Sequence, residues 1–352
     1  MNISDYLETV IKKNASDLHL VVGNKPNLRI DGKLVPYPNS EVLNEEEAEK
    51  LVFELVSAEQ KELLLVNKEI DFSFALGDIA RFRVNAYYQK GYLACALRLI
   101  PIKVRDVEEL NMPKVCHQFA GLQQGFILVT GPTGHGKSTT IAAIINEVNQ
   151  LRPVHILTIE DPIEYVYPTG KAIISQRELH LDTHSWEIAL RSALREDPDV
   201  VLIGEMRDYE TIASAITIAE TGHLVFATLH TNSAAQTIDR IVDVFPEHQQ
   251  DQIRLQLSNS IAGVISQRLV PAIEGGRYPA VEILLANSAV KTVIREGKTH
   301  QIDNIIQTSG ELGMVTLETS LAELAKSGKI SLETATTYAL KPQEVVRLVR
   351  GR

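Results

Sequence analysis

The chain has 352 residues, of which 35 are lysine or arginine and 45 are aspartate or glutamate, so its formal net charge is −10. Hydrophobic residues make up 44% and charged residues 23%, which is typical of globular proteins, excludes a disordered or fibrous chain, and at this length allows two or three domains. The acidic balance argues against a general nucleic-acid binder, because such proteins neutralise phosphates with cationic side chains.

The first hundred residues combine helix and strand patterns. Apolar residues recur at helical spacing in residues 3–13 and 44–67. Asp31-Gly32 separates two short apolar runs and indicates a hairpin turn. We therefore predict a small α+β domain over residues 1–100, with strands at residues 18–22, 28–30, 71–75, 80–88 and 92–100.

Three arginines stand out on two neighbouring predicted strands of this domain. In ARFRVNAYYQ, apolar residues alternate with Arg81 and Arg83, so both arginines share the polar face, and Arg98 lies on the next strand. In an isolated protein such residues are surface charges. In a ring of subunits, an arginine from a neighbour can complete an active site and stabilise the charge of a transferred phosphate.

The pattern changes after residues 101–113, a polar segment bounded by prolines that predicts a linker. Strand and helix patterns then alternate, and the strands are continuously apolar. This predicts a mostly parallel sheet between two layers of helices, in a domain over residues 114–352. We expect helices at residues 138–150, 185–196 and 208–220, and strands at residues 125–130, 155–160, 199–204, 223–229, 267–273 and 280–285.

A complete phosphate-binding motif lies between the first strand and first helix of this domain. The sequence GPTGHGKS matches G-x-x-x-x-G-K-[ST] in the strand–loop–helix context that supports it. Glycines let backbone amides surround an anion, and the helix N-terminus favours negative charge. Lys137 is suited to the β and γ phosphates, and Ser138 to Mg²⁺. The predicted nucleotide ligands here are Gly131, Pro132, Thr133, Gly134, His135, Gly136, Lys137, Ser138 and Thr139.

Acidic residues follow two later strands, at the edge where open α/β sheets bind ligands. Glu205 follows the strand DVVLIG, and Glu160, Asp161 and Glu164 follow the strand HILTIE. Either Glu205 or Glu164 can orient the attacking water, and we favour Glu205, which we also predict as a Mg²⁺ ligand together with Ser138. Helix capping explains Asp161 about equally well.

Two histidines delimit the strand HLVFATL. His223 opens the strand and His230 closes it, so they lie at opposite ends and do not resemble two ligands of one metal. His230 lies at the same sheet edge as the phosphate loop, where it can contact a γ-phosphate. For an isolated histidine, a hydrogen-bonded structural role is the simpler interpretation.

Together, GPTGHGKST, ILTIEDPIEY, DPDVVLIGEMRD and ETGHLVFATLHTNSA, with ASDLHL and RFRVNAY near the N-terminus, resemble the PilT family, the type IV pilus retraction ATPases of twitching motility, within the wider type II/IV secretion ATPases. The resemblance implies a PAS-like N-terminal domain, a RecA-like P-loop core and a homohexameric ring that hydrolyses ATP with Mg²⁺. It also implies nucleotide-binding roles for Glu160, Asp161 and His223, and a catalytic role for the N-terminal arginines Arg81, Arg83 and Arg98.

The resemblance also implies a place in the cell. The partner would be a polytopic platform protein of the inner membrane, on which the ATPase docks from the cytoplasmic side. A cytosolic location fits the N-terminus, which does not resemble a signal peptide, and the lack of an apolar run of about 18 residues. The two cysteines exclude the four-cysteine zinc element of extension-type relatives.

The motifs are less specific for the direction of the motor than for the family. Residues 289–296, AVKTVIRE, stand where retraction-type members carry A-I-R-N-L-I-R-E, with Lys-Thr in place of Arg-Asn. Pilus extension, type II secretion, a RecA-like nucleic-acid motor and a non-enzymatic nucleotide-binding subunit remain alternatives.

Overall fold

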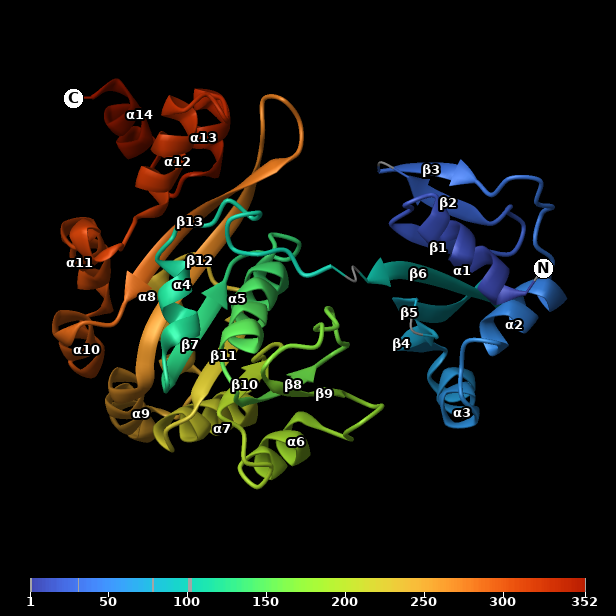
Figure 1. The fold of residues 1–352 in the computed structure, drawn as a ribbon, viewed down its shortest axis with the longest axis horizontal. Helices are drawn as coiled ribbons and strands as arrows, with labels where there is room; N and C mark the ends of the chain where they lie inside the picture. Colours follow the sequence, from blue (N-terminus) through green and yellow to red (C-terminus); the bar gives the residue numbers. More distant parts are fainter. Residues whose placement is uncertain (1, 31, 78, 101–102, 352) are drawn as a thin grey trace. The chain divides into compact units, whose positions relative to one another are not determined.

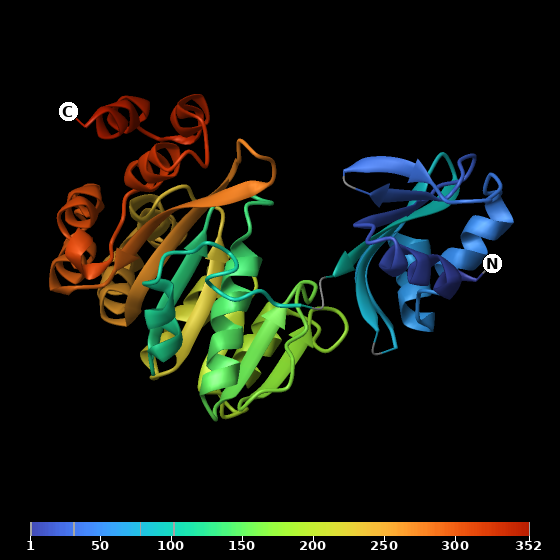
Figure 2. The ribbon, with the colours of Figure 1, turned by 45° about the horizontal axis from the view of Figure 1, so that its top comes forward.

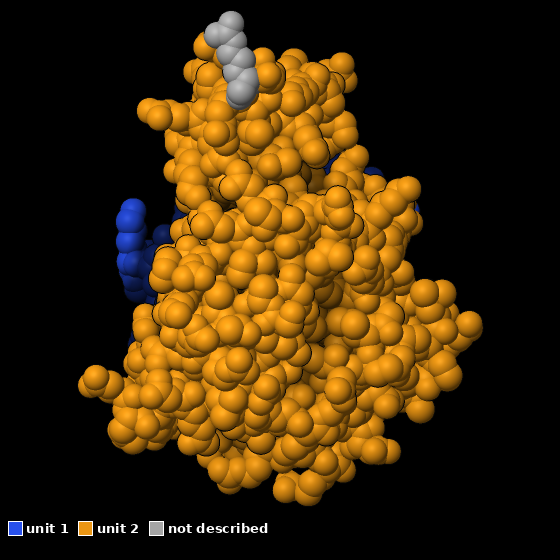
Figure 3. All heavy atoms as spheres, turned by 90° about the vertical axis from the view of Figure 1, so that its left-hand side faces the viewer, with its two compact units in different colours: residues 1–103, 162–166 blue, residues 104–161, 167–352 orange. Residues whose placement is uncertain are grey.

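The computed structural model describes residues 2–30, 32–77, 79–100 and 103–351. These residues form two compact units (Figure 3). Unit 1 contains residues up to Lys103 together with the segment Pro162–Val166, and unit 2 contains the segments Val104–Asp161 and Tyr167–Arg352. Each unit is described by itself below.

Unit 1 is a six-stranded antiparallel sheet with three helices. The strand order is β3-β2-β1-β6-β5-β4. Leu18 and Leu20 of β1, and Phe82 and Val84 of β5, face the buried core. The elements are α1 (Ile3–Lys12), β1 (Asp17–Leu20), β2 (Asn27–Ile30), β3 (Lys33–Pro36), α2 (Glu45–Phe53), α3 (Ala58–Asn67), β4 (Glu69–Leu76), β5 (Ala80–Gln89) and β6 (Tyr92–Ile100).

The single helix expected over residues 44–67 is wrong, because two helices occupy this range. Helix α3 has its own N-cap, where the Ser57 side chain accepts a hydrogen bond from the Gln60 amide and the Gln60 side chain accepts one from the Ser57 amide. Such a capping box satisfies amides that have no partner within a helix and favours a new start there. β2 and β3 pair as expected for a hairpin, while Asp31 of the predicted turn lies outside the described residues.

Unit 2 is built on a seven-stranded sheet in the order β13-β12-β7-β11-β10-β8-β9. All neighbouring strands are parallel except the pair β12 and β13. The predicted α/β fold with a mostly parallel sheet is therefore confirmed. The strands are β7 (Gly125–Thr130), β8 (His155–Glu160), β9 (Ile173–Glu178), β10 (Val200–Ile203), β11 (Leu224–Leu229), β12 (Ile261–Pro271) and β13 (Arg277–Leu285).

Helices cover both faces of this sheet (Figure 2). Along β7, Phe126 and Leu128 join the core on one face, while Ile127 and Val129 join the core on the other. The second face is covered by α4 (Cys116–Gly121) and α5 (Lys137–Leu151). The first is covered by α6 (Trp186–Ala193), α7 (Tyr209–Glu220), α8 (Ala234–Asp243), α9 (Glu247–Ser260), α10 (Ser288–Arg295) and α11 (Ile302–Thr308).

Three further helices form a small layer against the antiparallel pair β12 and β13 (Figure 1). They are α12 (Leu317–Lys326), α13 (Leu332–Tyr338) and α14 (Pro342–Arg350), and their core includes Val270 and Ala280 of the two strands. A short 3₁₀ turn, η1 (Thr299–Gln301), precedes α11, and another, η2 (Gly310–Leu312), leads from α11 into this layer. The layer formed by α12 to α14 therefore packs on the part of the sheet that lies next to β7.

The largest differences from the strands predicted from the sequence concern β9 and β12. β9 was not predicted, because its residues are only partly buried at the edge of the sheet and lack a continuous apolar pattern. β12 begins at Ile261, six residues before the expected start at Gln267. In the predicted linker, residues 101–102 lie outside the described residues, while Val107 and Met112 are buried in unit 2. Among the helices that the structure describes, none is long and apolar enough to span a membrane.

Candidate active site

The phosphate loop, Glu205 and His230 all follow parallel strands that end at the same edge of the unit 2 sheet. β11 pairs with β7 up to Leu229 and Thr130, and with β10 up to Ala227 and Ile203. Because parallel strands point the same way, the residues that follow them meet at one edge. The structure thus brings together three of the features that the sequence singled out.

The loop between β7 and α5 requires glycine at specific positions. Gly131 has a φ of +140° and Gly136 a φ of +83°, both in the region that favours glycine. A Cβ atom on Gly131 would lie 2.2 Å from the backbone oxygen of Gln267 on β12. The loop therefore packs directly on the neighbouring strand, and its glycines permit the close approach.

Lys137 is buried, with 8% of its surface exposed, at the start of α5. Its Nζ donates hydrogen bonds to the backbone oxygens of Gly131 at 2.9 Å and Pro132 at 3.1 Å. These bonds fold the lysine over its own loop. Ser138 and Thr139 follow in the first turn of α5, at the positive end of the helix dipole.

His230 connects the phosphate loop with Glu205. Its Nδ1 lies 3.4 Å from both Lys137 Nζ and Thr133 Oγ1, and its Nε2 lies 3.0 Å from Glu205 Oε1. A proton on Nε2 would be donated to the carboxylate, which leaves Nδ1 as the acceptor toward the loop. The histidine is thus placed to respond to changes on either side.

Glu205 is held in its ionised form. Arg207 Nη2 lies 2.8 Å from its Oε2. Burial by itself raises the pKa of Glu205, but the hydrogen bond and charge of Arg207, with the charges of His230 and Lys137, outweigh burial and lower the pKa overall. An ionised carboxylate accepts hydrogen bonds and is able to orient a water molecule or bind a cation.

The acidic residues at the end of β8 and directly after it lie in different environments. Glu160 is buried, and its Oε1 accepts hydrogen bonds from Thr158 Oγ1 at 2.8 Å and Gln176 Nε2 at 3.4 Å. Gly204 makes room for it, since a Cβ atom there would lie 3.2 Å from the Glu160 Cα. Asp161 and Glu164 are exposed, and Glu164 belongs to the segment that groups with unit 1.

His223 lies at the opposite end of β11 from His230. Its Nδ1 is 3.1 Å from the backbone oxygen of Ile218 and 3.0 Å from Thr221 Oγ1, at the end of α7. Its backbone oxygen accepts from Gly125, the first residue of β7. The structure therefore does not bring His223 together with the phosphate loop of its own chain, and its contacts are those of a structural histidine.

The three arginines lie within unit 1, each beside a polar partner. Arg81 donates to Ser73 Oγ, Arg83 donates to Asp71 Oδ2 at 2.6 Å, and Arg98 donates to Asp17 Oδ1 at 2.9 Å. Arg83 and Arg98 are directly opposite each other on β5 and β6. The predicted polar face is therefore present, with positive charge gathered across two strands.

A model of the family described as Type II/IV secretion system protein matches residues 1–275. The chain belongs to this family. The "Type IV pilus retractation ATPase PilT" of Pseudomonas aeruginosa is 48% identical over 97% of this chain and 99% of its own length. The "Twitching motility protein" of Neisseria gonorrhoeae is 49% identical over 88% of this chain and 83% of its own length.

A solved structure of this type II/IV secretion family is also similar along the whole chain. The crystal structure of the pilus retraction motor PilT with bound ADP superposes with a TM-score of 0.92 at 45% identity, and the match covers 99% of each chain. The resemblance to PilT and to secretion ATPases predicted from the sequence motifs is thus confirmed.

Sequence reasoning missed Gln267, which lies beside the phosphate loop of this secretion-family protein. Gln267 is 2% exposed; its Nε2 donates to the backbone oxygen of His135 at 2.9 Å, and its Oε1 accepts from Thr140 Oγ1 at 2.7 Å. The Leu269 amide also donates to His135 Nδ1 at 2.9 Å. β12 thus holds the loop from the side, and no motif at Gln267 signals this contact.

The contact with Leu269 predicts a pH effect on stability. Burial, followed by the charges of Arg268, Lys137 and Arg277, lowers the pKa of His135, so the folded state favours the neutral ring. The unfolded chain then binds more protons, and stability falls as pH drops below about 6.5. His135→Asn keeps an acceptor without titrating, so we expect it to lose less stability than the wild type between pH 7.5 and 5.5. Urea unfolding of both proteins at the two pH values measures this, and equal losses would contradict it.

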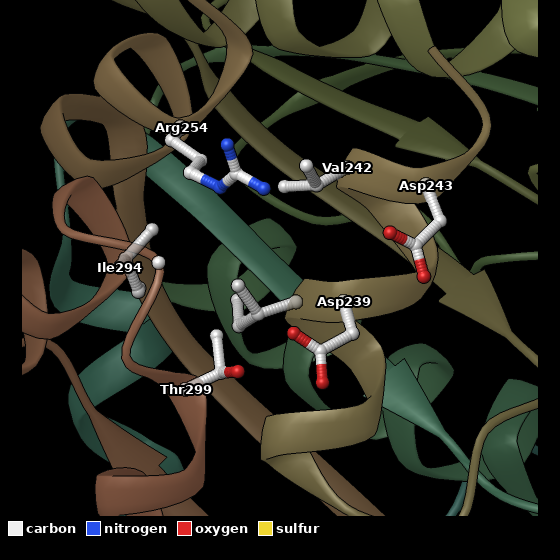
Figure 4. A pocket seen from close by; sticks show the side chains of 8 residues that line it. Asp239, Val242, Asp243, Arg254, Ile294 and Thr299 are labelled. Carbon is white, nitrogen blue, oxygen red and sulfur yellow. The ribbon is translucent and has the colours of Figure 1, made fainter. Parts of the chain in front are cut away.

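A separate pocket lies among α8, α9 and the segment after α10 (Figure 4). Arg254 extends from α9 toward Val242 on α8, and its Nη1 pairs with Asp251 at 2.8 Å. None of the residues that line this pocket belongs to the predicted nucleotide site. They are Ile238, Asp239, Val242, Asp243, Arg254, Ile294, Gly297 and Thr299.

Proposed function

We propose that this protein is a hexameric motor ATPase that hydrolyses ATP to power type IV pilus retraction. The observation that carries the proposal is the contact series from Lys137 through His230 to Glu205, at the edge of a parallel sheet. It joins the residue suited to bind phosphate with the residue suited to activate water. The similarity to retraction ATPases over nearly the full chain supports the mechanical role.

In the proposed mechanism, the loop amides, Lys137 and Ser138 bind the triphosphate. Lys137 leaves the oxygens of its own loop and turns to the β and γ phosphates, because ionised phosphate oxygens are stronger acceptors than peptide oxygens. Mg²⁺ neutralises phosphate charge when bound, and Ser138 and Glu205 are the residues proposed to hold it. Glu205 orients the attacking water, and His230 registers the presence of the γ-phosphate.

The remaining predicted residues have supporting roles in this proposal. Glu160 and Asp161 contribute negative charge beside the cation, and Glu164 is the second candidate for the base. Residues 1–100 act as a PAS-like domain, residues 101–113 as a linker and residues 114–352 as the RecA-like ATPase domain. Hydrolysis and product release would shift the two domains against each other and so produce movement.

The proposed setting is the cytoplasmic face of the inner membrane, where the ring would dock on a polytopic platform protein at the base of the pilus. This rests on the similarity to pilus ATPases. Pilus extension or type II secretion is the alternative, because the motif AVKTVIRE at α10 has Lys-Thr where the retraction-type motif has Arg-Asn.

Two experiments test the function. Phosphate release by the purified protein, measured with and without DNA, should show Mg²⁺-dependent turnover that DNA does not stimulate. Deletion of the gene should leave pili that extend but do not retract, as seen by light microscopy of labelled pili. Normal retraction in the deletion strain would refute the motor role, and DNA-stimulated turnover would favour the nucleic-acid motor.

The arginine hypothesis predicts a loss of turnover that mixing subunits repairs. Arg98→Gln should lower kcat about tenfold or more while ADP binding stays within twofold, because the arginine would act on the transition state of a neighbouring subunit. Hexamers that mix Arg98→Gln with inactive Lys137→Ala subunits should regain activity at sites with both residues intact. Steady-state phosphate release by the mixed hexamers measures this.

Arg29→Gln is the matched control for Arg98→Gln. Arg29 also faces Asp17, at 3.6 Å, but it was not predicted to reach a neighbour. If both variants lose activity equally, the effect belongs to the Asp17 ion pairs rather than to an arginine acting across subunits.

A further inference from the structure

A carboxylate on β13 is buried in unit 2, far along the chain from the predicted motifs. Glu282 is 5% exposed, and its Oε1 accepts a hydrogen bond of 2.7 Å from the amide of Ala234. Ala234 is the first residue of α8, and the first amides of a helix have no acceptor within the helix. Glu282 therefore supplies that acceptor from another element, and its negative charge lies at the positive end of the helix dipole.

The start of α8 is also the end of the loop that carries His230. Residues 230–233 connect β11 to α8. Thr231 Oγ1 lies 2.7 Å from Thr237 Oγ1, and the Asn232 amide donates to Gln236 Oε1 at 2.8 Å. These bonds tie the loop to the first turn of α8, so a contact that holds this turn also holds the backbone next to His230.

Charged groups from several elements act on Glu282. Arg268 lies on the neighbouring strand β12, Asp303 on α11, Glu318 on α12 and Lys341 at the start of α14. Burial raises the pKa of Glu282 to about 7; Asp303 and Glu318 raise it too, while the Ala234 amide and Lys341 lower it. The Glu282 carboxyl therefore changes its charge near neutral pH, and charged groups on the C-terminal helices influence its pKa.

These helices are themselves linked by polar contacts. Glu318 Oε1 accepts from the amides of Leu340 at 3.1 Å and Lys341 at 2.9 Å, and Lys341 Nζ pairs with Asp303 at 2.7 Å. Arg268 Nη1 donates to the backbone oxygen of Tyr338 at 2.6 Å. The arrangement of α11 to α14 thus determines which charges surround Glu282.

We propose that Glu282 is a positioning residue for hydrolysis, which holds the start of α8 and thereby keeps His230 against Glu205. The inference rests on the ATPase function proposed above. Glu282 acts through the loop rather than on nucleotide, because β12 separates its strand from β7 and the phosphate loop. Its loss should therefore affect the chemical step more than nucleotide affinity. The C-terminal helices would also affect the active site in this way, because charged groups on them act on Glu282.

The test compares two substitutions in the full-length hexamer. Glu282→Leu removes the acceptor and should lower kcat about tenfold, while the Kd for ADP stays within twofold. Glu282→Gln keeps an oxygen acceptor for the Ala234 amide and should retain at least a third of the wild-type kcat. Phosphate-release kinetics and ADP titration calorimetry give both quantities.

The pH profile separates this role from simple structural support. A carboxylate accepts a hydrogen bond more strongly than a carboxylic acid, so the wild-type kcat should rise as pH increases through about 7. Glu282→Gln does not titrate and should lack that rise. Glu318→Leu is the matched control, because it removes another buried carboxylate from the same region without touching the His230 loop. We expect it to lower the melting temperature and to keep the rise in kcat, moved to lower pH, because the charge of Glu318 raises the pKa of Glu282.

Three results would overturn the inference: an unchanged kcat in Glu282→Leu, an equal loss of kcat and ADP affinity, or the wild-type rise through pH 7 in Glu282→Gln. If Glu282→Leu does not fold, the profile of Glu282→Gln decides. If the wild-type protein has no turnover, the proposed function is overturned first. If the wild type is active and the Glu282 variants behave like it, this inference alone is overturned.

Discussion

Replacing Lys137 with alanine is expected to reduce ATP hydrolysis at least 100-fold, the range typical for loss of a preorganised charge at a reacting phosphate. The Lys137 amine is buried over the phosphate loop, and its Nζ lies 3.4 Å from His230 Nδ1. Its removal therefore takes away the positive charge for the γ-phosphate and one contact of His230, the residue proposed to register that phosphate. Phosphate release under saturating ATP measures the loss.

Lys171→Ala is the control for this change. Lys171 is an exposed lysine of the same unit, outside the phosphate loop, and its Nζ reaches the backbone oxygen of Leu151 at 3.5 Å. The control should keep normal turnover. Lys137→Arg should not restore activity, because the planar guanidinium does not replace a compact ammonium group in a buried position. Substantial turnover by Lys137→Ala with a normal melting temperature would refute the site assignment.

Glu205→Gln should lower kcat about 100-fold or more while ATP binding is retained, if Glu205 orients the attacking water. The amide has no negative charge, and it also loses the ion pair with Arg207 and the charged acceptor for His230. Single-turnover hydrolysis and binding of a fluorescent ATP analogue separate the chemical step from affinity.

Glu164→Gln is the decisive comparison, since both glutamates were candidates for the base. We expect Glu164→Gln to keep most of its turnover, because the contact with His230 belongs to Glu205. The opposite ranking of the two variants would assign the base to Glu164. Because the pKa of Glu205 is lowered, its ionisation should not limit activity near neutral pH.

The sequence was most informative where a structural rule acts over a few neighbouring residues. The helix after the phosphate loop, the apolar strand GFILVT and the alternation that follows it predicted the parallel sheet correctly. Periodicity failed where the local pattern was weak. The partly buried edge strand β9 has no continuous apolar run, and the break between α2 and α3 depends on the single capping residue Ser57.

The candidate site likewise has features that the local sequence predicted and features that it did not. The motifs placed Lys137, Glu205 and His230 at one edge of a sheet, because each follows a strand and parallel strands end together. The resemblance implied a nucleotide-binding role for His223, although the six-residue strand β11 separates it from His230 and the phosphate loop. Arg207 was also missed as the partner of Glu205, since an arginine near an acid in sequence is common and its side-chain direction is not encoded locally.

The phosphate loop, the strand–helix alternation and the family could be predicted from contiguous residues. The packing of Gln267 against Gly131 and the hydrogen bond from the Ala234 amide to Glu282 became visible in the folded chain alone. These pairs are far apart in the chain and meet because β12 lies next to β7, and β13 next to β12, in the sheet. Strand order follows from how all elements share one core, and hydrophobic periodicity in single segments carries no information about it.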